Sequence, residues 1–219
     1  MQRYADELGR ASPLRATLPS FRPRDGQLRL AAEAGDVMER GGVLVAEAAT
    51  GIGKSLAYLV PAALSGRRVV VSTATKALQG QLLDEDLPLA RQATGLDISA
   101  AVVKGRGNYV CRVQRAFAHQ RVPEELQPEL LRLEDWLVRT RTGDRDELPL
   151  VPHDAVWREL AVGPDRCRGA RCTERDGCFA ELARERAAGC EIVLVNHALY
   201  LADLALRAAR GGEPVILPE

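Results

Sequence analysis

The stretch GVLVAEAATGIGKSLAYLV, residues 42–60, decides the fold. Its first part, VLVAEA (43–48), is a short apolar run typical of a buried strand, and SLAYLVPAAL (55–64) has the pattern of a helix. Between them, AATGIGKS (48–55) follows the phosphate-loop pattern G-x-x-x-x-G-K-[ST], with Ala48 in place of the first glycine. A strand, a glycine-rich loop and a helix in this order predict a nucleotide-binding site.

The residue types of this loop suit phosphate binding. Backbone N–H groups around Gly51 and Gly53 would surround the phosphates, Lys54 would contact the β- and γ-phosphates, and Ser55 would ligate Mg²⁺. A plain glycine-rich turn is the alternative, and the flanking strand and helix make it the weaker interpretation. Hydrolysis also needs an acid at the end of another buried strand. The sequence offers none, because Asp84-Glu85-Asp86 lies in a segment predicted to be helical.

Further apolar patterns predict the rest of an α/β domain. Helical spacing covers residues 27–39, 76–93 (with a break near Pro88) and 197–210, and Gly41-Gly42 should end the first of these helices. Buried strands are predicted at 67–73, 98–103 and 191–196. This order predicts a parallel sheet covered on both faces. Residues 1–20 are polar and irregular and are expected to form a loose lead-in.

The segment between residues 104 and 189 differs in composition from the rest. It is rich in Arg, Glu and turn residues, contains four of the five cysteines, and shows one clear helix at 123–141 and no strand-like run. We interpret it as an insertion into the sheet.

The cysteines of the insertion have the spacing of a metal site. Cys167, Cys172 and Cys178 form C-x₄-C-x₅-C, and Cys111 lies far upstream. No C-x₂-C pair is present, so a zinc ribbon fits poorly, and the spacing modestly favours a four-thiolate iron–sulfur cluster over zinc. Cys190 directly precedes an apolar strand and is expected to pack in the core.

Composition excludes few functions. The 219 residues carry a formal net charge of zero, so overall charge gives no nucleic-acid signal. No apolar run would span a bilayer and the start lacks a signal-peptide core, so a cytoplasmic location is expected. The arginines near the cysteines form either a solvated surface or a local basic patch: Arg106, Arg112, Arg115, Arg166, Arg168 and Arg171.

Five segments follow one another in order: AEAATGIGKS, VVVSTATKALQGQLLDEDLPL, VVKGRGNYVC, the three-cysteine cluster and IVLVNHALYLAD. Together they resemble the DinG/XPD family of iron–sulfur superfamily 2 DNA helicases, in its bacterial DinG/YoaA-like branch, from about residue 21 onward. The resemblance implies a RecA-like P-loop NTPase domain with an inserted, mainly helical iron–sulfur domain. It also implies 5′→3′ unwinding of DNA that depends on ATP and Mg²⁺, with single-stranded or forked DNA as the partner.

Particular residues acquire roles through this resemblance. FRPRDGQ (21–27) implies that Arg24 and Gln27 lie near the adenine end of ATP, and STATKALQGQ (72–81) resembles motif Ia, which contacts single-stranded DNA. The implied ligands of a [4Fe–4S] cluster are Cys111, Cys167, Cys172 and Cys178. The implied nucleotide site comprises Arg24, Gln27, Ala48, Thr50, Gly51, Ile52, Gly53, Lys54 and Ser55.

The sequence departs from the family pattern near its end. A DEAH box, an arch domain and a second motor domain with its arginine finger are not found, so we expect an incomplete motor whose partners are the missing domains. The expected organisation is a lead-in (1–20), the first part of the RecA-like domain (21–103), the cluster domain (104–189) and a return to the RecA-like domain (190–219). Little ATP hydrolysis is expected from this chain alone. Alternatives are a DNA-binding cluster module without catalysis and a small P-loop kinase or ATPase.

Overall fold

The computed structural model describes residues 2–9, 13–17, 21–212 and 217. The chain divides into two compact units. The first contains residues 1–102 and 189–200, and the second contains residues 103–188 and 201–219. The first unit is an α/β domain and the second is built from short helices and turns.

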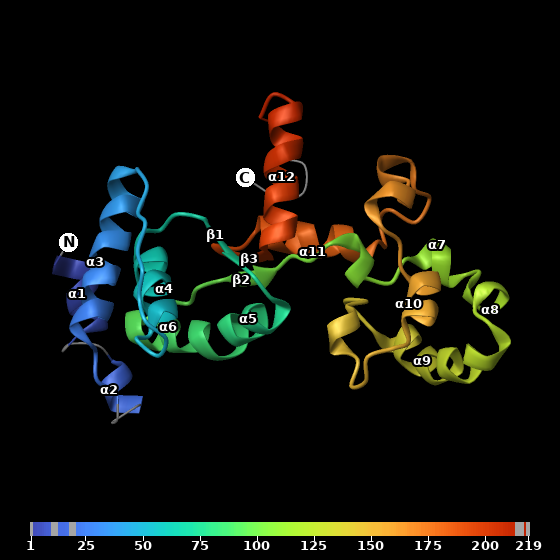
Figure 1. The fold of residues 1–219 in the computed structure, drawn as a ribbon, viewed down its shortest axis with the longest axis horizontal. Coiled ribbons are helices and arrows are strands. Elements are labelled where there is room, and N and C mark those ends of the chain that lie inside the picture. Colours follow the sequence, from blue (N-terminus) through green and yellow to red (C-terminus); the bar gives the residue numbers. More distant parts are fainter. Residues whose placement is uncertain (1, 10–12, 18–20, 213–216, 218–219) are drawn as a thin grey trace. The chain divides into compact units, whose positions relative to one another are not determined.

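A parallel sheet forms the centre of the first unit (Figure 1). Its strands are β1 (Val69–Thr73), β2 (Ala100–Val102) and β3 (Ile192–Asn196), in the order β1-β3-β2. Leu194 of β3 aligns with Val71 on one side and Val102 on the other. Residues 192–195 are fully buried, as expected for the central strand of a covered parallel sheet. The predicted parallel α/β sheet is therefore confirmed for three strands.

The strand predicted at 43–48 is wrong. Residues 41–49 have no regular secondary structure, and the side chains of Val43 and Val45 are 90% and 92% exposed. An apolar run becomes a strand only where a neighbouring strand pairs with its N–H and C=O groups. No strand in the described part of the chain pairs with this segment.

Helices of the first unit follow the predicted pattern closely. They are α3 (Asp25–Arg40), α4 (Lys54–Leu64), α5 (Lys76–Gln81), α6 (Leu87–Thr94) and the start of α12 (His197–Ala209). Gly41 ends α3 with φ of 80°, a conformation that favours glycine. Leu59 and Val60 of α4 pack in the same core as Ile192 and Leu194 of β3.

A widened turn joins α5 to α6. Residues Leu82–Asp86 form one π-helical turn, η1, and the N–H of Leu87 bonds the carbonyl of Leu82 five residues earlier. Pro88 has no N–H and its ring would clash with a carbonyl of the preceding turn in a regular α-helix. The break predicted near Pro88 is thus a local widening of a continuous helical path.

The N-terminal segment differs from the expected loose lead-in. Helices α1 (Gln2–Leu8) and α2 (Leu14–Thr17) are present; residues 1, 10–12 and 18–20 lie outside the described residues. Tyr4, Leu8 and Leu14 are buried, and the last two belong to the core of the first unit. Three apolar side chains in a polar segment are too few for a periodic signal, but they are enough to dock a short helix.

The second unit is mainly helical, as predicted for 104–189. Its helices are α7 (Arg112–Arg115), α8 (Ala118–Arg121), α9 (Gln127–Arg139), α10 (Asp154–Leu160) and α11 (Phe179–Ala188). Between them lie 3-10 turns η2 (Arg106–Asn108), η3 (Glu124–Leu126), η4 (Arg145–Glu147), η5 (Pro164–Arg166) and η6 (Gly169–Arg171). Its described residues between 103 and 188 contain no strand. A core that includes Leu130, Trp157 and Leu160 holds the helices together.

The docking of α1 leads to a testable difference between two glycines. A Cβ on Gly35 of α3 would lie 2.2 Å from Cδ2 of the buried Tyr4 ring, whereas a Cβ on Gly80 of α5 would meet nothing within 4 Å. Ala in a helix is ordinarily better than Gly by about 1 kcal/mol. We therefore expect Gly80→Ala to be neutral or stabilising, and Gly35→Ala to destabilise the chain by about 1–2 kcal/mol in chemical denaturation because overpacking outweighs propensity. Stabilisation by Gly35→Ala would mean that α1 is not docked.

Candidate functional site

The glycine-rich loop leads directly into helix α4, whose first residue is Lys54. Gly51 and Gly53 have φ of 75° and 84°, a region that other residues rarely adopt. A Cβ on Gly53 would also lie 2.2 Å from Nε2 of Gln27. Both conformation and space therefore require glycine at position 53. The free N–H groups and the dipole at the start of α4 make this end of the helix suitable for an anion.

Two residues at the start of α3 brace the loop. Arg24 donates from Nη1 to the carbonyl of Gly51, and Gln27 donates from Nε2 to the carbonyl of Gly53 at 3.0 Å. Gln27 is 3% exposed, so its amide is fixed by packing. The structure thus brings Arg24 and Gln27 to the loop backbone. Their position near the adenine end of ATP stays a prediction.

Lys54 lies over its own loop. Its Nζ donates to the carbonyl oxygens of Ala48 at 2.7 Å and Ala49 at 3.0 Å. An ammonium held by two loop carbonyls is positioned at the concave side of the loop, where phosphate oxygens would replace those carbonyls as acceptors. Thr50 of the same loop is exposed.

A cavity of ≈ 390 Å³ lies beside the loop. Ile52 lines it from the loop and contacts Gly26 of α3, where a Cβ would lie 3.0 Å from Ile52 Cδ1. The other lining residues come from α3 and from the irregular segment before the loop: Gly26, Arg29, Leu30, Glu33, Leu44, Ala46, Glu47, Ala48 and Ala49. The cavity has room for a group larger than a phosphate next to the loop.

The hydroxyl of Ser55 lies near Tyr58, one turn later in α4, and near Asp86 of the π-turn η1. Burial is the main cause that raises the pKa of Asp86, and the nearby hydroxyl of Ser55 opposes this rise. Sequence reasoning rejected Asp86 because it lies in a helix; Pro88, which forces the widened turn, was the available signal.

The motif-Ia-like segment begins at the carboxyl end of β1. Ser72 Oγ lies 2.7 Å from Nδ1 of His197, which follows the neighbouring strand β3. Thr75 caps α5 by accepting from the N–H of Leu78. Lys76 and Leu78 are exposed, but Gln79 is buried, so only part of residues 72–81 is available to a ligand.

The four predicted ligand cysteines line one cavity of ≈ 30 Å³ in the second unit. Cys111 precedes α7, Cys167 follows η5, Cys172 follows η6 and Cys178 precedes α11. Each thiol therefore lies where a short helix begins or ends. All four are half-buried. Cys190, which was expected in the core, is also only half-buried, and its carbonyl accepts from Arg68 Nε at 3.1 Å.

Among the described residues, no group of three or more His, Cys, Asp and Glu side chains is arranged to hold a metal ion. The four thiols share one cavity, which brings the predicted ligands into one region of the second unit.

Electrostatics around the cysteine cavity are organised by Glu181 of α11. It forms ion pairs with Arg106, with Arg184 at 3.2 Å and with Arg175 at 3.8 Å. Burial tends to raise the pKa of Glu181, but the hydrogen bond and charge of Arg106 and the charges of the other two arginines keep the pKa below its usual value. The carboxylate is thereby held charged, next to the cavity that it helps to line.

A backbone N–H group points at one of the sulfur atoms. The N–H of Gly169 donates to Cys167 Sγ at 3.5 Å. Burial raises the pKa of the Cys111 thiol, and the nearby backbone N–H groups of Gln114 and Val113 oppose that rise. Such donors stabilise a thiolate and tune a metal group bound to it.

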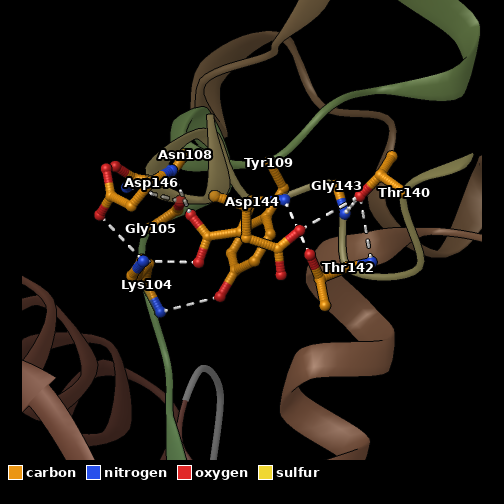
Figure 2. A network of polar contacts seen from close by, with 10 residues as sticks. Lys104, Gly105, Asn108, Tyr109, Thr140, Thr142, Gly143, Asp144 and Asp146 are labelled. Atoms are coloured by element: carbon orange, nitrogen blue, oxygen red, sulfur yellow. Dashed lines mark hydrogen bonds and ion pairs between the residues drawn. The ribbon is translucent and has the colours of Figure 1, made fainter. Parts of the chain in front are cut away.

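Lys104 fixes the segment that carries Cys111. Figure 2 shows the ammonium of Lys104 between the carboxylates of Asp144 and Asp146. The distance from Nζ to Oδ2 of Asp146 is 2.9 Å. The backbone N–H of Lys104 donates to the hydroxyl of Tyr109 at 3.2 Å. Burial lowers the pKa of Lys104, but the two carboxylates outweigh it and leave the pKa raised.

Backbone bonds extend this network to the cysteine. The N–H of Val110 donates to Gly143 at 2.9 Å and that of Cys111 donates to Leu160 at 2.7 Å. Cys111 is thus held from both sides by segments that its own unit supplies.

The arginines near the cysteines fall into two groups. Arg106 is paired with Glu181, Arg115 binds the carbonyl of Leu137 at 2.7 Å, and Arg112 stacks on the Phe179 ring. By contrast, three arginines that flank Cys167 and Cys172 are exposed: Arg166, Arg168 and Arg171. Together with Arg112, whose side chain is also exposed, this second group is available as a basic surface.

These features define a parallel α/β domain with a phosphate-binding type of loop, together with a helical unit that carries four cysteines around one cavity. The chain is 35% identical to the ATP-dependent DNA helicase YoaA of Escherichia coli K12 over 98% of its length and 34% of the relative's. It is 38% identical to the ATP-dependent helicase DinG of Mycobacterium tuberculosis H37Ra, over 90% of its length and 32% of the relative's.

The chain is therefore a homologue of the YoaA and DinG proteins, and it spans about a third of the length of these curated relatives. A protein named 3′-5′ exonuclease DinG from Bacillus subtilis is 31% identical over 90% of this chain and 22% of its own length. No family model matches the chain. In the described residues, no helix is long and apolar enough to cross a bilayer.

The Lys104 network predicts a large effect from a single substitution. Lys104→Met would remove the cation that pairs with Asp144 and Asp146, whose side chains are 16% and 39% exposed. We expect a loss of about 2–4 kcal/mol in the unfolding free energy of the second unit, because an uncompensated, partly buried charge remains. Arg139→Met is the control: its ion pair with Asp135 is fully in solvent, and we expect a change within about 0.5 kcal/mol. Similar effects of the two substitutions in urea denaturation would contradict the structural role of Lys104.

Proposed function

We propose that this chain is the nucleotide- and DNA-binding part of an ATP-dependent 5′→3′ DNA helicase that carries a [4Fe–4S] cluster. The observation that carries the proposal is the loop at 48–55, whose glycines, lysine and following helix start have the arrangement that phosphate binding needs. Homology to proteins named ATP-dependent DNA helicases supports the class of reaction. A cytoplasmic location is part of the proposal.

The proposed nucleotide site uses the loop and the helix behind it. N–H groups at Gly51, Gly53 and the start of α4 bind the phosphates, and Lys54 exchanges its two loop carbonyls for phosphate oxygens. Ser55 ligates Mg²⁺. The side chains of Arg24 and Gln27 hold the loop by hydrogen bonds to its carbonyl groups. Ala48, Thr50 and Ile52 are the remaining loop residues of the proposed site. The adjacent cavity of ≈ 390 Å³ has room for the nucleoside.

Hydrolysis depends, in this proposal, on parts of the helicase outside these residues. The acid that would orient the attacking water is expected from a DEAH box, and transition-state charge from an arginine of a second motor domain. The chain spans about a third of its relatives' length, which leaves room for both in a complete protein. No observation on the described residues favours the kinase alternative.

The proposed cluster ligands are Cys111, Cys167, Cys172 and Cys178. The chemistry of the set fits, because four thiols line one cavity and the N–H of Gly169 faces the sulfur of Cys167. A [4Fe–4S] cluster bound there would supply a rigid cross-link between the four segments and a site for one electron. The residues of this chain contribute the thiolates, the N–H donors and the charge balance set by Glu181 and its arginines.

DNA is the proposed partner. The exposed part of residues 72–81 lies at the carboxyl end of β1, and the exposed Arg166, Arg168 and Arg171 offer positive charge to a phosphate backbone. Single-stranded or forked DNA is the expected form, since the motif-Ia resemblance belongs to helicases that move along one strand.

Nucleotide binding can be tested on the purified chain with a fluorescent ATP analogue and Mg²⁺. Lys54→Ala removes a charge-assisted contact worth about 1.5–3 kcal/mol, so we expect an affinity loss of about 10- to 100-fold. Lys76→Ala is the matched control, because this exposed lysine lies outside the loop. Its nucleotide affinity should be unchanged. Equal affinities of all three proteins would refute a phosphate-binding role for the loop.

The cluster can be tested by anaerobic purification followed by iron and sulfide quantitation. We expect about four irons and four sulfides per chain, the content of a Cys₄ cubane. Cys111→Ser should lose most of the iron, while Cys190→Ser should retain it because Cys190 does not line the cavity. One zinc per chain without sulfide would overturn the assignment.

A further inference from the structure

Arg112 and Phe179 form a contact between two cysteine-bearing segments of the second unit. Arg112 directly follows Cys111, and Phe179 directly follows Cys178. The guanidinium carbon of Arg112 lies 4.9 Å from the centre of the Phe179 ring. A cation at this distance is attracted to the face of an aromatic ring. The contact therefore joins the chain next to one predicted ligand to the chain next to another.

Gly177, on the other side of Cys178, is a second neighbour of Arg112. A Cβ on Gly177 would lie 3.0 Å from both Cζ and Nε of Arg112, so the guanidinium packs directly against the glycine backbone. Gly177 is not among the glycines with positive φ, so alanine could adopt its backbone conformation and would press only on the arginine. Arg112 thus contacts the residues on both sides of Cys178.

The Phe179 ring is fixed in the core of its unit. It is 6% exposed, and Gly143 lies against it: a Cβ on Gly143 would be 2.3 Å from Cδ2 of the ring. The carbonyl of Gly143 accepts from the N–H of Val110 at 2.9 Å. The ring is therefore linked to the residue before Cys111 through Gly143 and to the residue after it through Arg112.

We propose that Arg112 is a positioning residue for the metal group of the second unit: by stacking on Phe179 it holds the thiol of Cys111 at the cavity of the other three. Cys167, Cys172 and Cys178 follow one another closely, whereas Cys111 lies far upstream. A distant ligand loses more freedom on metal binding unless the fold orders it beforehand. The stacked arginine supplies part of this order without touching the metal group.

A second stacked arginine in the same unit provides a matched control. Arg121 lies over the Phe117 ring, with its guanidinium carbon 5.2 Å from the ring centre, and it also donates to Gln114 at 2.6 Å. Neither Arg121 nor Phe117 lines the cysteine cavity or adjoins a cysteine. Both Arg112 and Arg121 are exposed. Their removal should cost the folded unit similarly little, so a difference between them reports on the cysteines.

This inference rests on the proposed iron–sulfur cluster, and its first test measures how fast a chelator removes iron from the anaerobically purified chain. For Arg112→Ala we expect iron release to be about two- to five-fold faster than for the wild type, the population change that one exposed cation–π contact can produce. Arg121→Ala should release iron at the wild-type rate. Equal rates for the two variants would overturn the inference.

Two further variants distinguish positioning from a simple effect of charge. Gly177→Ala keeps every charge but presses on the guanidinium, so it should also accelerate iron release. Gly163→Ala is its control, because a Cβ there would meet nothing within 4 Å. Arg112→Lys keeps the charge without the planar group and should recover only part of the wild-type retention. Wild-type retention in both Gly177→Ala and Arg112→Lys would mean that charge alone acts, and the positioning role would be wrong.

Cross-linking of the metal-free chain separates this inference from the proposed cluster. In the background C167S/C172S/C190S, a short bis-maleimide can join only Cys111 and Cys178. We expect Arg112→Ala to slow this cross-link about two- to five-fold, and Arg121→Ala to leave it unchanged, at equal rates of labelling by a single maleimide. Unchanged cross-linking in Arg112→Ala, or no cross-link in the background chain, refutes the role of Arg112. Slower cross-linking in a chain whose wild type purifies without iron and sulfide supports that role and removes the proposed cluster.

Discussion

The pairing of β3 with both β1 and β2 is the constraint on which the first unit depends. β3 comes about ninety residues after β2 in sequence, yet it occupies the centre of the sheet. Ile192 donates to the carbonyl of Ser99, and Glu191 accepts from both the N–H and the hydroxyl of Ser99. The chain segments just before and just after residues 103–188 are therefore joined by hydrogen bonds. Such closure fixes the ends of a long insertion at an entropic cost that grows only slowly with its length.

A helix or strand can be predicted from the sequence when contacts between residues close in sequence are enough to form it. Helices α3, α4 and α9 and strand β3 have strong local patterns, and their prediction needed only periodicity. The segment 43–48 has an equally good strand pattern, but a strand also needs a pairing partner, which no local pattern reveals. In α1 the opposite holds: Tyr4 and Leu8 give a weak pattern, and their burial against the core decides that the helix forms.

The candidate sites were predicted to different depths for the same reason. The phosphate loop is contiguous, so Gly53, Lys54 and Ser55 could be placed from sequence alone. The four cysteines were selected by residue type, and only the structure brings Cys111 to the cavity of the other three. Asp86 was missed because its proximity to Ser55 requires the packing of the π-turn η1 against another helix, α4. Residue chemistry can be predicted from a sequence, whereas convergence of distant residues follows from packing.

The exposed segment around Val43 and Val45 has a consequence for how the chain behaves in solution. A segment with exposed apolar side chains and no strand partner in the described structure is a template on which another strand can form, and β1 is an edge strand of the described sheet. At high concentration two copies can satisfy each other's edges, which competes with correct assembly. Expression of these residues alone should therefore be limited by association between strands, and solubility should respond to a lysine placed at position 43 or 45 more than to any change in the core.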